Sequence, residues 1–120
     1  RKDYVYFSKA QRDCVLKIHD FVVEHIIEHY TIEELAERFE ISPTSLKKCF
    51  KEMYGVPIYT YCRTYRLQIA EKMLREGQLS VAEIAAKIGY INPNKFTSAF
   101  CSEYKMTPTE YKKNVQMDRK

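Results

Sequence analysis

The sequence predicts an all-α protein in which two similar helix-turn-helix units, at 1–57 and 78–120, are joined by a long connecting helix at 58–77. Three observations carry this prediction. The chain contains an internal duplication, its predicted helices open on recurrent capping residues, and the stretch before Gly77 has an uninterrupted helical pattern that ends on a glycine stop.

The duplication relates the segments on either side of the connecting helix. TIEELAERF (31–39) aligns with SVAEIAAKI (80–88) at a shift of 49, and SPTSLKKCFKEMYGVPIYTY (42–61) aligns with NPNKFTSAFCSEYKMTPTEY (92–111) at a shift of 50. A one-residue gap in a turn is all that the alignment requires. Identical residues occupy the pairs Glu34/Glu83, Ala36/Ala85, Pro43/Pro93, Phe50/Phe100, Tyr54/Tyr104 and Tyr61/Tyr111.

The helices of the first copy follow from capping residues and apolar spacing. A capping-box pattern at Ser8–Gln11 opens a first helix, whose apolar residues at 15, 18, 22 and 26 carry it to about Tyr30. Thr31 caps a second helix, and Ser42 caps a third helix that stops at Gly55. Two helices separated by a turn of about three residues are the helix-turn-helix arrangement.

The second copy repeats this arrangement. Ser80 caps a helix over 81–88, Gly89 opens the turn, and Asn92 caps a helix that begins with proline. Thr107-Pro108 then starts a last short helix through about Asn114. Together with the connecting helix, these segments make seven predicted helices.

Basic charge gathers in the middle of the chain. The net charge is +4, but residues 42–75 hold seven Lys or Arg against two acids, whereas 1–41 carry −3 and 76–120 carry +2. A basic stripe of this kind is typical of a phosphate-binding surface, and it is equally compatible with a solvated basic face. Charge alone leaves both interpretations open.

Several function classes find no support in the sequence. The four cysteines form no C-x-x-C pair, so we expect no disulfide framework and a reducing, cytoplasmic compartment. His25 and His29 lack a third ligand, so we expect no metal and no cofactor. No catalytic constellation predicts an enzyme, and no apolar run approaches the length of about 18 residues that predicts a membrane span.

A set of residues at fixed spacing runs through both copies. It consists of Leu35-Ala36, Ser42, Leu46, Phe50-Lys51, Tyr54-Gly55, Tyr61, Arg66-Leu67, Ala70, Leu74, Ile84-Ala85, Gly89-Tyr90, Asn92, Phe96, Phe100, Thr107-Pro108 and Tyr111. With these residues, over roughly 10–113, the chain resembles the DNA-binding domain of the AraC/XylS family of transcription regulators.

The resemblance implies a fold and partners. The fold is seven helices in two homeodomain-like helix-turn-helix subdomains held by a connecting helix. The implied partners are double-stranded promoter or operator DNA, RNA polymerase, and an N-terminal effector or dimerisation domain, which would make this chain a C-terminal part. Activation or repression of transcription would take place in the bacterial cytoplasm, at the nucleoid.

The chain departs from the family pattern at three places. Cys101 stands where a Lys or Arg is usual after the last Phe of the second recognition helix, and Pro57-Ile58 replaces the more usual Ser-Pro. Lys105 replaces a glycine, so this helix must either accept a left-handed residue or end in another way. The departures at Cys101 and Lys105 bear on the phosphate contacts of the second unit.

Recognition residues follow from the rule that the N-terminal half of the second helix enters the major groove. The resemblance places Thr44, Lys47 and Lys48 at base-reading positions, with a solvated lysine face as the alternative. The second recognition helix offers Asn94, Lys95, Thr97 and Ser98, which form a less basic set. We expect the two helices to occupy adjacent major-groove segments about 34 Å apart.

Phosphate contacts are expected from helix starts and from further basic residues. The candidates are Ser42, Lys51, Arg63, Ser80, Asn92 and Thr107. Because the second recognition helix is weakly basic, a helical protein-interaction module with a decayed DNA-binding face is the alternative function. Random duplex binding that barely responds to salt would favour that alternative.

The connecting helix places Arg66 in the middle of a wide apolar arc that includes Tyr59 and Leu67. A guanidinium in that position must find a carboxylate or helix-end carbonyls in a flanking unit, which would fix the angle between the units. We therefore expect a structural role for Arg66, with direct phosphate contact as the alternative.

Overall fold

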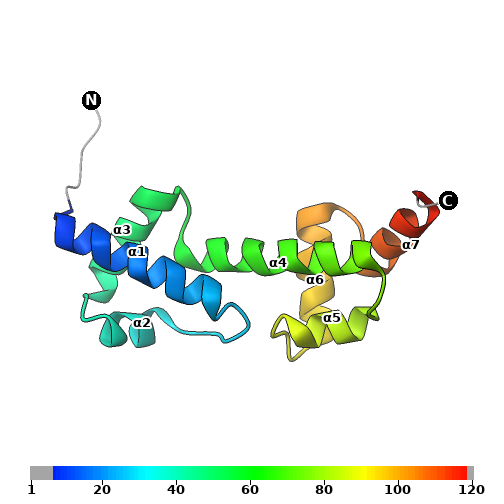
Figure 1. The fold of residues 1–120 in the computed structure, drawn as a ribbon, viewed down its shortest axis with the longest axis horizontal. Coiled ribbons are helices and arrows are strands. Elements are labelled where there is room, and N and C mark those ends of the chain that lie inside the picture. The colour runs from blue at the N-terminus through cyan, green and yellow to red at the C-terminus, as the bar shows by residue number, and fades with distance from the viewer. Residues whose placement is uncertain (1–6, 119–120) are drawn as a thin grey trace. The chain divides into compact units, whose positions relative to one another are not determined.

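The computed structural model describes residues 7–118, and all regular structure in this range is α-helical (Figure 1). In chain order the helices are α1 (Lys9–Glu24), α2 (Ile32–Arg38), α3 (Pro43–Tyr54), α4 (Ile58–Glu76), α5 (Val81–Lys87), α6 (Pro93–Tyr104) and α7 (Pro108–Asp118). The predicted all-α fold with seven helices is confirmed. None of these helices is long and apolar enough to cross a membrane.

The capping predictions are also confirmed. Ser8 forms a full capping box with Gln11, since its hydroxyl accepts from the Gln11 amide and its own amide donates to the Gln11 side chain. Thr31 and Ser80 form the same box at α2 and α5. Each box satisfies two amides that have no partner inside the helix, which stabilises the helix start by about 1 kcal/mol.

The first helix ends earlier than the sequence predicts. α1 stops at Glu24 rather than near Tyr30, because His25 leaves the helical region with φ −110° and ψ 39°. In a continuing helix the Ile26 carbonyl would accept from the amide of Tyr30. Here it accepts from Arg66 Nη1 at 3.3 Å, a contact distant in sequence that apolar spacing cannot show. At the other end of the chain, α7 runs on to Asp118 instead of Asn114.

The helices form two compact units whose boundary lies within α4. Of the described residues, the first unit holds those up to His25 together with His29–Cys62, and the second holds Ile26–Glu28 and those from Arg63 to 118. The first turn of the connecting helix therefore belongs to the first unit, and the rest of that helix belongs to the second unit.

Each unit has its own core. In the first unit α3 packs on α1 and α2. Its buried residues are Val15, Ile18, Val22, Leu35, Ala36, Leu46, Cys49, Phe50 and Ile58. The second core consists of Leu67, Ala70, Leu74, Ile84, Ala85, Ile88, Phe96, Ala99 and Phe100. Burial of each large side chain contributes about 1.5–3 kcal/mol. Aligned positions such as Phe50 and Phe100 are fully buried in both units, so the duplication holds in three dimensions.

Both recognition helices end on a residue in the left-handed region. Gly55 has φ 83° at the end of α3, and Lys105 has φ 64° at the end of α6. The amide of each residue bonds back to the helix, to the carbonyls of Lys51 and Cys101 respectively, at 2.8 Å. α6 thus ends in the same way as α3, although it has no glycine at this position. Lys105 adopts the left-handed conformation there, which is energetically unfavourable for a residue with a Cβ atom.

Candidate nucleic-acid interface

The turn before each recognition helix has the same hydrogen bonds in both units. After α2 the amides of Glu40 and Ile41 donate to the carbonyls of Glu37 and Ala36. After α5 the amides of Gly89 and Tyr90 donate to Ala86 and Ala85. This is a Schellman ending, which needs a left-handed residue; Glu40 fills that position with φ 56° and Gly89 with φ 89°. The turn therefore directs α3 and α6 away from the preceding helix in the same manner.

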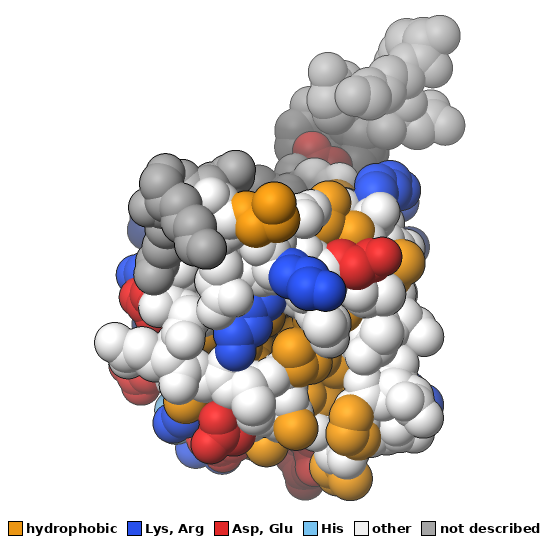
Figure 2. All heavy atoms as spheres, turned by 90° about the vertical axis from the view of Figure 1, so that its right-hand side faces the viewer, with side chains coloured by type: hydrophobic (Ala, Val, Ile, Leu, Met, Phe, Trp, Pro, Cys, Tyr) orange, Lys and Arg blue, Asp and Glu red, His pale blue; other side chains and the backbone are white. Residues whose placement is uncertain are grey.

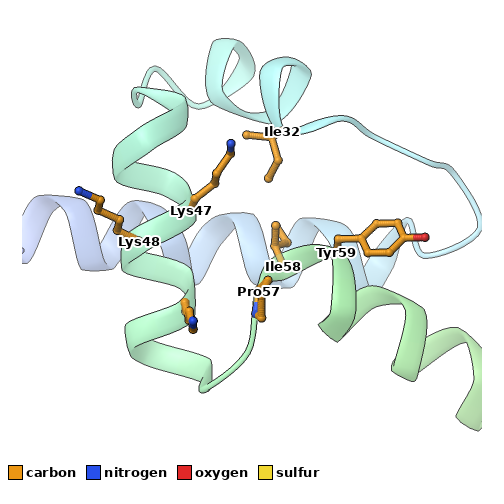
Figure 3. A pocket seen from close by; sticks show the side chains of 7 residues that line it. Ile32, Lys47, Lys48, Pro57, Ile58 and Tyr59 are labelled. Carbon is orange, nitrogen blue, oxygen red and sulfur yellow. The ribbon is translucent and has the colours of Figure 1, made fainter. Parts of the chain in front are cut away.

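The outward face of α3 is exposed and basic. Thr44, Lys47, Lys48 and Lys51 all lie on it, opposite the buried Leu46, Cys49 and Phe50. In the part of the chain that the structure describes, no carboxylate lies within ion-pair distance of these three lysines. Lys47 and Lys48 leave α3 on opposite sides in Figure 3. This face thus presents several donors without internal partners.

The outward face of α6 is less basic. Asn94, Lys95 and Ser98 are exposed, whereas Thr97 is half-buried. Lys95 is the one basic residue of α6 (Pro93–Tyr104). Cys101 is exposed at the position that corresponds to Lys51. On the face that Figure 2 shows, basic and acidic side chains are interspersed with hydrophobic ones. Electrostatic attraction for phosphate is therefore weaker at the outward face of α6 than at that of α3.

The helix-start amides differ in how far they are already occupied. Ser42 Oγ accepts from the amide of Ser45 at 3.1 Å, which leaves the amide of Thr44 on the outward side of α3. At α6, by contrast, two amides are occupied, since Asn92 Oδ1 accepts from the amide of Asn94 at 2.9 Å and the Asn92 carbonyl accepts from the amide of Lys95 at 3.0 Å. The start of α3 is thus the freer of the two for a phosphate oxygen.

Ser80 and Thr107 sit at helix starts that already hold a carboxylate. Glu83 and Glu110 each accept from the capping residue's own amide, at 2.8 and 2.9 Å. Hydrogen bonds from the capping residues lower the pKa of both carboxyls, so both are ionised at neutral pH. A phosphate at either helix start would approach that negative charge, which weighs against tight binding there.

Arg63 and Arg66 of α4 lie in different surroundings. Arg66 is buried at 6% exposure, donates to the Ile26 carbonyl through Nη1, and has an Nε without a hydrogen-bond partner. Arg63 is half-buried. The geometry of Arg66 suits a structural role, whereas Arg63 retains access to solvent and to a phosphate.

A matching aromatic triangle closes each unit. In the first unit the ring centroids of Phe50, Tyr54 and Tyr61 lie 4.6–5.5 Å apart, and in the second those of the aligned Phe100, Tyr104 and Tyr111 lie 4.6–5.9 Å apart. These rings stabilise the cores and are not presented for base stacking.

The hydroxyl at the end of each triangle bonds to a different partner. Tyr61 bonds to His19 Nε2 at 2.8 Å, whereas Tyr111 donates to Glu71, which also accepts from Arg75. Burial, followed by the bond to Glu71, raises the pKa of Tyr111 to about 12. Partial burial opposes ionisation of Glu71, but the bonds from Arg75 and Tyr111 outweigh it and lower the pKa of that carboxyl.

Two exposed apolar residues beside the recognition helices were not predicted. Tyr59 belongs to the predicted apolar arc of α4, yet it is 71% exposed, because the first turn of α4 packs on the first core through Ile58, Tyr61 and Cys62 instead. The duplication carries a signal for this, since Tyr59 aligns with the polar, exposed Thr109. Ile91 is fully exposed directly before Asn92, whereas the aligned Ile41 packs on the first core.

Comparison with known proteins now identifies the family. A model of the helix-turn-helix domain matches residues 35–114, which run from within α2 to within α7 and include all of α3, α4, α5 and α6. The chain belongs to the AraC-type helix-turn-helix family. Members of this family are DNA-binding transcription regulators and not enzymes.

Individual relatives agree with this assignment. The chain is 32% identical over 109 residues to the uncharacterized HTH-type transcriptional regulator YtdP of Bacillus subtilis (strain 168), covering 86% of this chain and 14% of the relative. It is 33% identical over 87 residues to the RCS-specific HTH-type transcriptional activator RclR of Escherichia coli (strain K12), covering 72% and 31%. The chain therefore spans less than a third of either relative.

The fold matches a solved structure of the family. The DNA-binding domain of AdpA, crystallised in complex with a target DNA, aligns with a TM-score of 0.82 over 88% of this chain and 95% of that chain. At 23% sequence identity this likeness shows the fold. The predicted pair of helix-turn-helix subdomains is thereby confirmed.

Proposed function

We propose that this AraC-type chain binds promoter or operator DNA in a sequence-dependent manner through α3 and α6, each in a major-groove segment. The observation that carries the proposal is the outward face of α3. It is the second helix of a helix-turn-helix, and it presents Lys47, Lys48 and Lys51, which form no ion pair with any carboxylate of residues 7–118. The solved complex of the AdpA DNA-binding domain with a target DNA supports DNA binding by a domain of this fold.

On α3, Thr44, Lys47 and Lys48 contact base edges. Lysine donates to the O6 and N7 acceptors of guanine, and the methyl group of threonine packs against that of thymine. Lys51 lies farther along the helix and contacts a phosphate. Ser42 holds the start of α3 so that the amide of Thr44 meets another phosphate.

On α6, Asn94 pairs with adenine, and Lys95, Thr97 and Ser98 supply weaker contacts. Asn92 fixes the start of this helix through its bond to the Asn94 amide. α6 presents one lysine, whereas α3 presents three. We therefore propose that α6 contributes less affinity than α3 and reads a separate part of the recognised sequence.

Three further residues contact the DNA backbone in this proposal. Arg63 is half-buried and reaches phosphate from α4. Ser80 and Thr107 meet phosphate only through the amides that their capping boxes leave unoccupied, so their contribution is small. Sequence-independent contacts of this kind set the salt dependence of binding.

The rest of the regulator is also part of the proposal. Since the chain spans only a fraction of its relatives, we propose an N-terminal effector or dimerisation domain elsewhere in the protein. RclR is named an activator, which favours activation through contact with RNA polymerase. Such a protein acts in the bacterial cytoplasm, at the nucleoid.

The proposal is tested by binding titrations with the variants Lys47→Ala and Lys48→Ala. Each should weaken binding to a selected duplex by about 1–3 kcal/mol and relax preference at particular base pairs. Lys9→Ala is the matched control, because it removes the same charge from an exposed lysine of α1 that is already paired with Asp13. If the Lys47/Lys48 double variant keeps wild-type affinity and preference, the proposal is wrong.

A protein-interaction module with a decayed DNA-binding face is the competing function, and the weakly basic α6 is the observation that favours it. The same titrations separate the two functions. A DNA-binding protein that contacts several phosphates loses affinity steeply as salt rises, whereas a decayed face gives weak binding to random duplex that barely responds to salt.

A further inference from the structure

An apolar pocket of about 360 Å³ lies beside α3 in the first unit (Figure 3). Ile32 of α2, Lys47, Lys48 and Lys51 of α3, and Pro57, Ile58 and Tyr59 at the start of α4 line it. Its surface is formed almost entirely by carbon, including the stems of the lysines. The volume lies within the range of sites that hold small organic ligands.

Positive charge borders this apolar space. Lys47 extends from α3 toward Ile32 in Figure 3, so its ammonium group lies at the edge of the pocket, whereas Lys48 extends away from it. None of the lining residues is acidic, and no described carboxylate pairs with the lysines. The pocket is therefore complementary to a ligand with an apolar body and one negative group.

An exposed aromatic ring forms one wall. Tyr59 is 71% exposed and makes no ring contact among residues 7–118, although the neighbouring Ile58 is buried. A free aromatic face beside a proline offers a stacking surface for a flat ring.

The second unit lacks these features. In the aligned positions Thr97 replaces Lys47, Cys101 replaces Lys51 and Thr109 replaces Tyr59. The combination of ring, apolar floor and cation is thus specific to the first unit and does not follow from the duplicated fold itself.

We propose that this pocket binds an aromatic monocarboxylate. The ring lies against Tyr59, Pro57 and Ile58, and the carboxylate accepts hydrogen bonds from the ammonium group of Lys47. Because the proposed function assigns Lys47 to base reading, such a ligand competes with DNA for the same side chain. This second step rests on the proposed DNA contacts of α3, whereas ligand binding itself does not.

The test titrates the full chain, without DNA, with 1-naphthoate and follows backbone amide signals by NMR. At an ordinary ligand efficiency, a molecule of this size binds with a dissociation constant of about 1 mM. We expect saturable shifts at the amides of Lys47, Ile58 and Tyr59. Acetate has the charge without the ring, and 1-naphthalenemethanol has the ring without the charge, so both should bind at least about threefold more weakly.

Variants assign the site. Tyr59→Ala should weaken naphthoate binding about fivefold and Lys47→Gln about threefold. Lys87→Gln, which removes an exposed lysine from α5 in the other unit, should leave naphthoate binding unchanged. Absence of saturation up to about 10 mM, equal binding of the neutral analogue, or indifference to Tyr59→Ala would overturn the proposal. Binding of an aromatic peptide with flanking carboxylates, without naphthoate binding, would also overturn it in favour of a protein partner.

Competition is measured separately, with DNA. At about 5 mM naphthoate and a dissociation constant of about 1 mM, the apparent dissociation constant for DNA should rise about sixfold. Sodium acetate at equal concentration corrects for ionic strength. Naphthoate binding without this rise would overturn the competitive step. Failure of DNA binding in the absence of ligand would count against the proposed function and leave the pocket assignment standing.

Discussion

The left-handed residues at the ends of α3 and α6 allow a matched pair of stability predictions. Gly55 and Lys105 occupy aligned positions with φ 83° and 64°. Only Gly55 is free of the clash between Cβ and backbone that costs an L residue about 1–2 kcal/mol in this region. Placing a side chain at the first position, and removing one at the second, should therefore shift stability in opposite directions.

The magnitudes follow from the local structure. A Cβ added at Gly55 meets no heavy atom within 4 Å, so Gly55→Ala destabilises the folded state only through backbone strain. Alanine also lowers the conformational entropy of the unfolded chain, which offsets about 0.4–1 kcal/mol of that loss. The net loss is about 1 kcal/mol. Lys105→Gly relieves similar strain, but it frees the unfolded chain and removes the exposed bond from Lys105 Nζ to the Ser102 carbonyl at 3.1 Å. Its net gain is about 0.5 kcal/mol.

Scanning calorimetry is the appropriate assay, because it also shows whether the two cores unfold in one transition. At about 4 °C per kcal/mol, Gly55→Ala should lower Tm by about 4 °C and Lys105→Gly should raise it by about 2 °C. Circular dichroism at 20 °C should show unchanged helix content in both variants. A Lys105→Gly variant that is less stable than the wild type would refute the reasoning, since left-handed strain would then not govern this helix end.

Three further predictions concern α4, its partners and α3. Arg66→Met should lower the free energy of unfolding by about 1–2 kcal/mol in urea titrations, because the buried Ile26 carbonyl loses its donor while the unpartnered Nε is relieved; unchanged stability with loss of only salt-sensitive DNA affinity would contradict the structural role. The pKa of Tyr111 is raised from 10.0 to about 12, so the neutral phenol is favoured in the folded state and its stabilisation is lost as pH rises from 10.0 to about 12. Between pH 10.0 and about 12 the free energy of unfolding of Tyr111→Phe should therefore fall less than that of the wild type. Urea titrations of both proteins at each pH would disprove this if the two free energies of unfolding fell by the same amount. Lys51→Ala should weaken binding to all duplexes alike and reduce the slope of log affinity against log salt by about 0.9, with Arg63→Ala behaving similarly; a change in base preference would show that the residue reads sequence instead.

Much of the fold follows from local chemistry that a single sequence displays. Ser8, Thr31 and Ser80 stand at the helix starts they predict, because a capping hydroxyl and the glutamate or glutamine three residues on satisfy amides within one turn. The cores follow from the duplication, since an aligned apolar position in two copies of one fold faces the same interior. These signals lie within a few residues of one another or recur in the second copy.

The features that were missed depend on contacts distant in the chain. Just after the end of α1, the Ile26 carbonyl accepts a hydrogen bond from Arg66, forty residues later in the chain. The spacing of apolar residues does not predict that bond. Tyr59 is exposed because the first turn of α4 packs on the first core through Ile58, Tyr61 and Cys62, and not through the side of the helix that the second core buries. A helical wheel assumes one packing environment along the whole helix, whereas α4 belongs to two units.

The candidate site divides in the same way. The exposed residues of α3 and α6 could be predicted from the helix-turn-helix pattern. Which backbone amides are already hydrogen-bonded at the helix starts could not be predicted. Ser42 accepts from the amide of Ser45, whereas Asn92 accepts from the amide of Asn94. The apolar pocket beside Lys47 also required the folded unit, since Ile32 and Tyr59 come from different helices.

The central claim is that both recognition helices read DNA sequence, with α3 contributing the greater affinity. The most direct measurement is selection of bound sequences from a random duplex pool, performed with the wild type and with the Lys47→Ala, Lys48→Ala double variant. The wild type should select two distinct half-sites, and the double variant should lose one of them and retain the other. Enrichment of no sequence, or the same two half-sites from the double variant, would contradict it.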